Sequence, residues 1–181
     1  LSRLPGVQVA AILYEDGGAA GGMNGNTDLE AEAEAQAQAE AALRAARPSG
    51  AQVFRVSNDQ DVRLALEAAG PIDLGIMANF GIILSQASLS VPKGGVINFH
   101  PGLLPEQAGR TPVRRLWERG GGASGLTIHA ATSRVDAGPV LFVEPGRIDP
   151  TRSLEDNILE LFRLGLRRLE QVVFSSPKSA I

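Results

Sequence analysis

Short apolar runs alternate with helix-forming segments along this chain, and that alternation restricts the folds open to it. The residue pattern predicts strands at Val7–Leu13, Ala51–Val56, Ile72–Phe80 and Val96–His100. Between them it predicts helices at Thr27–Ala46, Asp59–Ala69 and Ser85–Leu89. A repeated order of strand, helix and strand is typical of a parallel α/β sheet with crossover helices.

The C-terminal part of the chain continues the pattern with shorter elements. It predicts a helix at Val113–Arg119, a strand at Gly125–Ala131 and a possibly antiparallel edge strand at Pro139–Val143. Ser153 then caps a last helix whose apolar face reaches Val173. We therefore expect an α/β catalytic domain over 1–150, with a C-terminal amphipathic helix within 151–181 packed on it.

Composition narrows the classes of function. The 181 residues suffice for one domain with a core, and the absence of cysteine excludes disulfides and thiolate chemistry. No apolar run of membrane length and no leader sequence is visible, so we expect a cytoplasmic protein without a membrane partner. A net charge of −3 argues against a nucleic-acid partner, because such proteins usually carry a basic face.

The strand Val96–His100 is the most informative chemically. It ends at Pro101, and side chains alternate along a strand, so Asn98 and His100 share one face while Phe99 takes the other. An amide can donate a hydrogen bond to a developing oxyanion, and an imidazole can move a proton near neutral pH.

Asp136 is a third candidate, because it too follows an apolar strand segment. In open α/β sheets, ligands lie beyond the carboxyl ends of the strands. A carboxylate there could hold an imidazole protonated or pass a proton through water. Asn98, His100 and Asp136 together suit the attack of an amine on an activated acyl carbon, although spacing in the sequence does not bring Asp136 next to His100.

Two motifs resemble a known family. The first is Asn98-Phe99-His100-Pro101 with Leu103-Leu104-Pro105, Gly109 and Pro112, and the second is Gly125–His129 followed by Val135–Pro139. Their order and gap are similar to those of the 10-formyltetrahydrofolate-dependent formyltransferases, which act on glycinamide ribonucleotide, methionyl-tRNA or sugar amines. The resemblance covers roughly Val7 to Gly146 and implies a Rossmann-like, mostly parallel sheet with helices on both faces.

The resemblance also implies residue roles and a formyl donor, 10-formyltetrahydrofolate. Asn98 and His100 would stabilise the oxyanion, and His100 with Asp136 would handle the proton. The folate-binding residues would be Phe80, Gly81, Ile82, Ile83, Leu84, Thr132, Ser133 and Val135. The acceptor, a small-molecule amine, would contact Leu104, Gly109, Arg110 and Pro112.

This sequence departs from the family pattern at several positions. Gly102 stands where the family usually has serine, and Ala130 and Ser133 replace residues that are commonly bulky and acidic. Val7–Leu13 matches the second strand of the family, so the first strand–helix unit is expected to be absent. Another element or subunit would then have to cover the exposed strand edges, and a homodimer is one possibility.

Other interpretations remain beside the transferase. Water could replace the amine, which would make the protein a 10-formyltetrahydrofolate hydrolase, or it could be a non-catalytic folate-binding subunit. His129 lies inside a predicted strand and is interpreted as a structural histidine. We expect no metal site from His100, His129 and Asp136, because the histidines lack the spacing of a ligand pair. Gly17–Asn26 lacks a phosphate-loop spacing and is interpreted as a surface loop.

Overall fold

The computed structural model describes residues 6–15, 37, 41–42 and 44–175. The predicted Gly-rich loop at 17–26 lies outside these residues. So does most of the predicted helix at 27–46, although residues 37, 41–42 and 44–46 are helical. No helix in the described part of the chain is long and apolar enough to cross a membrane.

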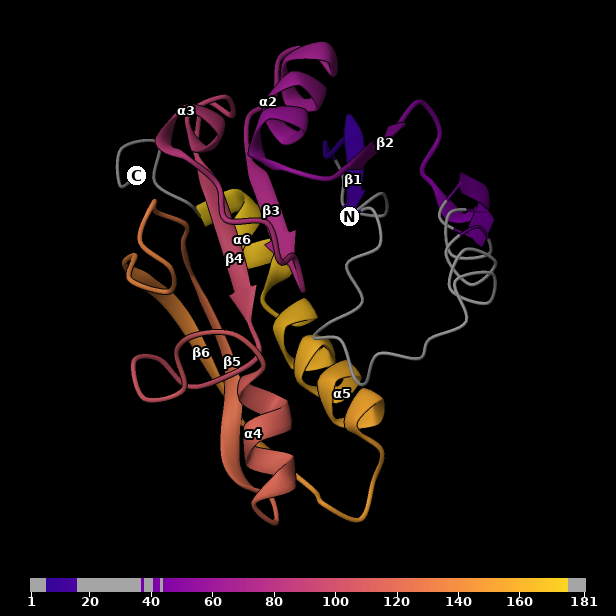
Figure 1. The fold of residues 1–181 in the computed structure, drawn as a ribbon. Helices are drawn as coiled ribbons and strands as arrows, with labels where there is room; N and C mark the ends of the chain where they lie inside the picture. Colours follow the sequence, from indigo (N-terminus) through magenta and orange to yellow (C-terminus); the bar gives the residue numbers. More distant parts are fainter. Residues whose placement is uncertain (1–5, 16–36, 38–40, 43, 176–181) are drawn as a thin grey trace.

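The first half of the described chain alternates strands and helices (Figure 1). Its elements are β1 (Ala11–Glu15), β2 (Gln52–Val56), α2 (Asp59–Ala68), β3 (Gly75–Ala78), α3 (Gln86–Leu89) and β4 (Val96–His100). The second half contains α4 (Pro112–Glu118), β5 (Gly122–Ala130), β6 (Val140–Ile148), α5 (Leu154–Leu166) and α6 (Leu169–Ser175).

The strands form two groups. β1 and β2 pair in parallel as a two-stranded sheet, and β3, β4, β5 and β6 follow one another in a four-stranded sheet. β3 and β4 are parallel, whereas β5 is antiparallel to β4 and β6 is antiparallel to β5. The predicted α/β fold with parallel strands is confirmed, in the form of a mixed sheet that has β6 at its edge.

β5 reverses the direction of the chain within the sheet. It follows β4 after a connection at 101–121 that contains α4, and it pairs with β4 in the antiparallel sense.

Several predicted strands have different bounds. β5 begins at Gly122 rather than Gly125, and β6 continues to Ile148 rather than ending at Val143. The strand predicted at Val7–Leu13 begins and ends too early in the sequence. β1 begins at Ala11, which pairs with Gln52 at the start of β2, and it continues to Glu15. Ile72–Phe80 was too long, because the partner strand begins at Val96 and the positive φ of Asn79 ends β3. Strand length here depends on the partner strand, which a local pattern does not show.

The last helix is not continuous, contrary to the prediction. The chain turns between α5 and α6, where the amide of Arg167 bonds the carbonyl of Leu164 and that of Arg168 bonds Gly165. These are the tighter i to i−3 bonds that end an α-helix. Arg168 also pairs with Glu144 of β6, which fixes this turn against the sheet.

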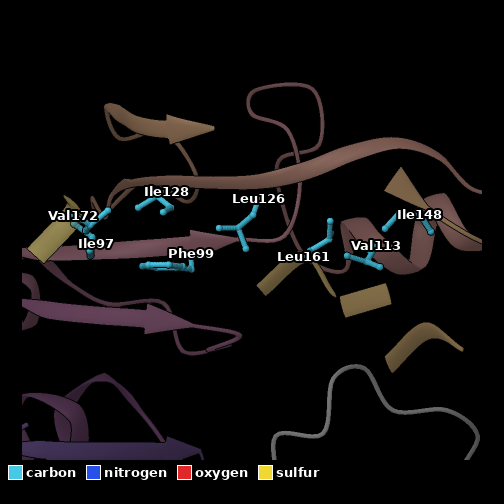
Figure 2. Packing of buried hydrophobic residues seen from close by; sticks show 8 residues of the cluster. All are labelled: Ile97, Phe99, Val113, Leu126, Ile128, Ile148, Leu161 and Val172. Carbon is cyan, nitrogen blue, oxygen red and sulfur yellow. The ribbon is translucent and has the colours of Figure 1, made fainter. Parts of the chain in front are cut away.

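The main core lies between the sheet and the C-terminal helices (Figure 2). Ile97 and Phe99 of β4 point into it, together with Leu126 and Ile128 of β5. Val96 belongs to a second cluster with α2 and α3, on the opposite face of β4. Helices therefore cover both faces, and the predicted alternation along β4, with Phe99 facing away from Asn98 and His100, is confirmed.

Ser153 is the N-cap of α5, as predicted, and its hydroxyl oxygen accepts a hydrogen bond of 3.0 Å from the amide of Asp156. Ser153→Ala is expected to lower the free energy of unfolding by about 1 kcal/mol, because this amide then has no partner within the helix. Urea denaturation would measure the loss. Ser153→Thr keeps an acceptor oxygen and is the control. Equal stabilities of the alanine and threonine variants would contradict the capping role.

Candidate active site

The three residues singled out in the sequence meet at one place. Asn98 and His100 lie at the carboxyl end of β4, and Asp136 lies in the loop between β5 and β6. Nδ1 of His100 is 3.4 Å from Oδ1 of Asp136, and each side chain is 6% exposed. The fold therefore supplies the contact between His100 and Asp136 that spacing alone left open.

The backbone around Asp136 fixes its carboxylate. Asp136 has a φ of 52°, in the left-handed region that Asp tolerates better than most residues. Its Oδ2 accepts a hydrogen bond of 2.7 Å from the amide of Gly109. Gly138 lets the same loop pass close to β5, because a Cβ there would overlap the carbonyl oxygen of Ala130.

His129 of β5 is a fourth member of the cluster. Its Nδ1 lies 2.9 Å from the carbonyl oxygen of Ala130, so this nitrogen carries the proton and donates it. Its Nε2 then accepts from Nδ2 of Asn98 at 3.2 Å, and lies 3.6 Å from Oδ1 of Asp136. Both nitrogens are partnered, as expected for a structural histidine, yet the ring contacts two of the three candidate catalytic residues.

His100 and Asp136 differ in charge near neutral pH. Burial lowers the pKa of His100 and outweighs the opposing effects of the Gln107 carbonyl and Asp136. The pKa of Asp136 is also lowered: burial acts to raise it, but the contacts of its carboxylate with His129, the Gly109 amide and His100 outweigh burial. A neutral imidazole therefore faces a carboxylate anion.

The hydrogen bonds of His100 show which nitrogen can accept a proton. Nε2 lies 2.9 Å from the carbonyl oxygen of Gln107, so Nε2–H donates there. Nδ1 then holds the lone pair, and a proton taken up at Nδ1 is shared with Asp136. The pair can act as a general base, in which Asp136 stabilises the imidazolium that forms.

A cavity of about 500 Å³ contains the cluster. Most of the predicted ligand-contacting residues line it: Phe80, Gly81, Ile82, Ile83, Leu84, Thr132, Val135, Gly109, Arg110 and Pro112. Leu104 and Ser133 do not line this cavity; the amide of Leu104 instead donates to Thr127. Ile83 and Val135 are 62% and 53% exposed, so the cavity mouth offers apolar surface to a flat ligand.

Several residues of the site were missed in the sequence. Glu15, at the end of β1, lines the cavity and accepts a hydrogen bond of 2.9 Å from the amide of Ile82, and a second from Gly81. The side-chain oxygen of Gln107 accepts hydrogen bonds from the amide of Leu103 and from the hydroxyl of Ser124. The contacts of Glu15 with residues 81 and 82, and of Gln107 with Ser124, have no local sequence signal, because only the fold brings these segments together.

Backbone strain is concentrated at this cavity. Within the described residues, the non-glycine positions with positive φ are Asn79, Thr111 and Asp136, and all three line it. Such conformations cost free energy and persist where the surrounding structure enforces them, often at functional sites. Their coincidence here is a second reason, beside the side-chain cluster, to treat this cavity as the candidate site.

Gly102 stands beside the ring of His100. A Cβ at position 102 would lie 2.9 Å from Nε2 of His100 and 3.1 Å from Cβ of Gln107. Glycine therefore allows the contact between His100 and the Gln107 carbonyl.

Among the described residues no group of three His, Cys, Asp or Glu side chains could hold a metal ion.

Comparison with known proteins gives consistent results. The family described as "Formyl transferase" matches residues 21–163. Methionyl-tRNA formyltransferase from Thermotoga neapolitana is 39% identical over 92 residues, which cover 49% of this chain and 29% of that protein. The enzyme of the same name from Janthinobacterium sp. is 38% identical over 114 residues, covering 59% of this chain and 36% of that protein. The matched segments thus span about a third of these relatives' length.

Solved structures share the fold. Glycinamide ribonucleotide transformylase 1 from Symbiobacterium toebii superposes with a TM-score of 0.61 at 24% identity, covering 72% of this chain and 66% of that one. Phosphoribosylglycinamide formyltransferase from Streptococcus pneumoniae gives a TM-score of 0.55 at 26% identity, covering 70% of this chain and 74% of that one.

Proposed function

Because this chain belongs to the formyl transferase family, we propose that it transfers a formyl group from 10-formyltetrahydrofolate to an amine of a small-molecule acceptor. The observation that carries this proposal is the convergence of Asn98, His100 and Asp136 on one cavity. An amide donor, a neutral imidazole and a carboxylate are the groups that acyl transfer to an amine requires.

Each side chain then has a defined task. The amide of Asn98, oriented by His129, is placed to donate to the formyl oxygen as negative charge develops there. Nδ1 of His100 accepts the proton that the attacking amine loses, directly or through water. Asp136 stabilises the resulting imidazolium at 3.4 Å. His100 would then return this proton to the donor nitrogen of 10-formyltetrahydrofolate as the bond from that nitrogen to the formyl carbon breaks, so that tetrahydrofolate leaves.

The residues present fit a folate. Apolar side chains from Phe80 to Leu84 and Val135 line the cavity, which suits the faces of a pterin ring. The amides of Gly81 and Ile82 already donate to Glu15, so these two groups cannot hydrogen-bond to the polar edge of the pterin ring in this conformation. We propose that polar groups of the loop at 132–136 form the hydrogen bonds to that edge instead.

The acceptor is the less determined half of the reaction. The acidic net charge of −3 favours a small molecule over a nucleic acid. Against this, the curated relatives named above are methionyl-tRNA formyltransferases, so the comparisons do not support the expected exclusion of nucleic acid. Methionyl-tRNA is therefore the second candidate acceptor, and Arg110 and Arg114 at the cavity are the residues that could meet its phosphates.

One assay tests the reaction and separates the acceptors. The chain is incubated with 10-formyltetrahydrofolate alone, with glycinamide ribonucleotide, with an amino sugar phosphate, or with methionyl-tRNA. Tetrahydrofolate release is followed in each case. We expect release only when a small amine is present. Release with methionyl-tRNA alone would favour the second candidate.

The remaining outcomes identify the alternatives. Release without any amine would mean that water is the acceptor and that the protein is a hydrolase. Folate binding without release in any mixture would favour a non-catalytic folate-binding subunit. If tetrahydrofolate is not released in any mixture and folate does not bind, the proposed function is contradicted altogether.

A further inference from the structure

The loop that follows β4 provides one partner of His100. It spans 101–111, between β4 and α4, and Figure 1 shows it beside β5. In this loop the main-chain carbonyl of Gln107 accepts a hydrogen bond of 2.9 Å from Nε2 of His100. Gln107 lies in a turn and not in a helix or a strand, so the position of its carbonyl depends on how the loop is held.

The side chain of Gln107 anchors this loop to β5. Its Oε1 accepts from the hydroxyl of Ser124 at 2.8 Å, and its Nε2 donates to the carbonyl of Ala123 at 3.0 Å. β4 ends opposite Thr127, so the segment 122–126 of β5 extends beyond the ladder between the two strands. The same segment pairs with β6 along its whole length. Gln107 therefore ties the loop to a part of the sheet that has its own partner strand.

Further bonds fix the shape of the turn. Oε1 of Gln107 also accepts from the amide of Leu103 at 2.9 Å, and the amide of Gln107 donates to the carbonyl of Leu103 at 2.7 Å. Thr127 is 0% exposed and provides a second anchor. Its hydroxyl donates to the carbonyl of Gly102 at 2.6 Å and accepts from the amide of Leu104 at 3.2 Å. These bonds hold both ends of the turn and thereby the direction of the Gln107 carbonyl.

Neutral His100 has one ring proton and two acceptors nearby. The carbonyl oxygen of Gln107 is 2.9 Å from Nε2, and Oδ1 of Asp136 is 3.4 Å from Nδ1. A carboxylate is the stronger hydrogen-bond acceptor, so a ring that lost the carbonyl would carry its proton on Nδ1. The position of the Gln107 carbonyl thus decides which ring nitrogen holds the lone pair.

We propose that Gln107 is a positioning residue for His100: its side-chain bonds keep the loop on β5 and its carbonyl on Nε2, so that Nδ1 can take up a proton. Glutamine supplies both the acceptor and the donor that the three side-chain bonds require. Gln107 does not line the cavity, so it acts through the ring and not on a ligand. The effect on catalysis rests on the proposed function, whereas the effect on the ring proton does not.

The ring proton of His100 can be located without folate. Long-range ¹H–¹⁵N NMR correlation distinguishes a protonated ring nitrogen from an unprotonated one, and the chain has two histidines, so His129→Gln identifies the signals. At neutral pH we expect the proton on Nε2 in the unaltered protein and on Nδ1 in Gln107→Ala. Glu106→Ala is the matched control, because Glu106 is the exposed neighbour in the same turn. It should leave the proton on Nε2.

Kinetics give a second readout. Gln107→Ala should lower kcat for formyl transfer about tenfold and leave KM for 10-formyltetrahydrofolate nearly unchanged, because Gln107 does not touch the cavity. The fall of activity at acid pH should also move to lower pH, since the hydrogen bond to the Gln107 carbonyl raises the pKa of His100. The charged or titratable groups that also act on this pKa remain in the variant, and they are Asp136, His129 and Arg115.

A milder variant keeps the test valid if Gln107→Ala fails to fold, which circular dichroism would show. Ser124→Ala removes one of the three side-chain bonds, so it should move the ring proton in a smaller fraction of molecules. A proton that stays on Nε2 in a folded Gln107→Ala protein, or that moves equally in Glu106→Ala, would overturn the proposal. A moved proton with unchanged kcat would overturn the role in catalysis. A moved proton in a protein that releases no tetrahydrofolate with any acceptor would contradict the proposed function alone.

Discussion

His100→Ala is expected to lower kcat/KM for formyl transfer roughly 10²- to 10⁴-fold, which is the range for loss of a general acid–base group. The reason is that the Nδ1 of His100, 3.4 Å from Asp136, is the proposed proton acceptor in the cavity that Asn98 also lines. Steady-state kinetics with the acceptor found by tetrahydrofolate release would measure it. His129→Gln is the comparison, because His129 orients Asn98, and a smaller loss is expected. A larger loss for His129→Gln would reverse the assignment.

The pH dependence of formyl transfer should also report the protonation of His100. Burial lowers the pKa of His100 below its usual 6.5, and in the proposed mechanism the neutral ring is the active form. Activity should therefore be high at neutral pH and fall as the pH drops through that lowered pKa. Asp136 favours the protonated ring, so Asp136→Asn should move this fall to still lower pH and also reduce the plateau. An unchanged profile in Asp136→Asn would exclude coupling between the two side chains.

Leu126→Ala is expected to lower the free energy of unfolding by about 2–5 kcal/mol, the cost of a cavity in a closely packed core. Leu126 is 0% exposed in β5, and it lies where Gly165 lets α5 approach the sheet. A Cβ at Gly165 would overlap the Leu126 side chain, so helix and sheet are already in close contact around the atoms that the substitution removes. Urea denaturation followed by circular dichroism would give the loss.

The control for the core prediction is Leu159→Ala in α5. Leu159 is 49% exposed, and substitution there should change the unfolding free energy by less than about 0.5 kcal/mol. The two variants remove the same atoms, so their difference isolates burial. Similar losses in both would mean that the cluster around Ile97 and Leu126 does not dominate the stability of the fold.

The local chemistry of the site could be predicted because it depends on short-range rules. Period-2 alternation along β4 assigns Asn98 and His100 to one face and Phe99 to the other, whatever lies next to the strand. The bond of Glu15 to residues 81 and 82, and that of His100 to the Gln107 carbonyl, could not be predicted. Each joins segments whose approach is set by packing.

The fold shows the same division. Element types followed from composition and periodicity, and Ser153 was identified as a cap from its side chain. The bounds of β1 and β3 did not follow, because a strand extends as far as its hydrogen-bonded partner allows. The break between α5 and α6 also escaped the pattern, since the apolar face continues across it.

The sequence by itself determined the alternating α/β order and three polar side chains suited to acyl transfer. Periodicity and side-chain chemistry are properties of neighbouring residues, so they can be read along the chain. The tertiary structure alone decided that Asp136 reaches His100 and that His129 joins them. Those features depend on how separate segments pack, and packing is a property of the whole folded chain.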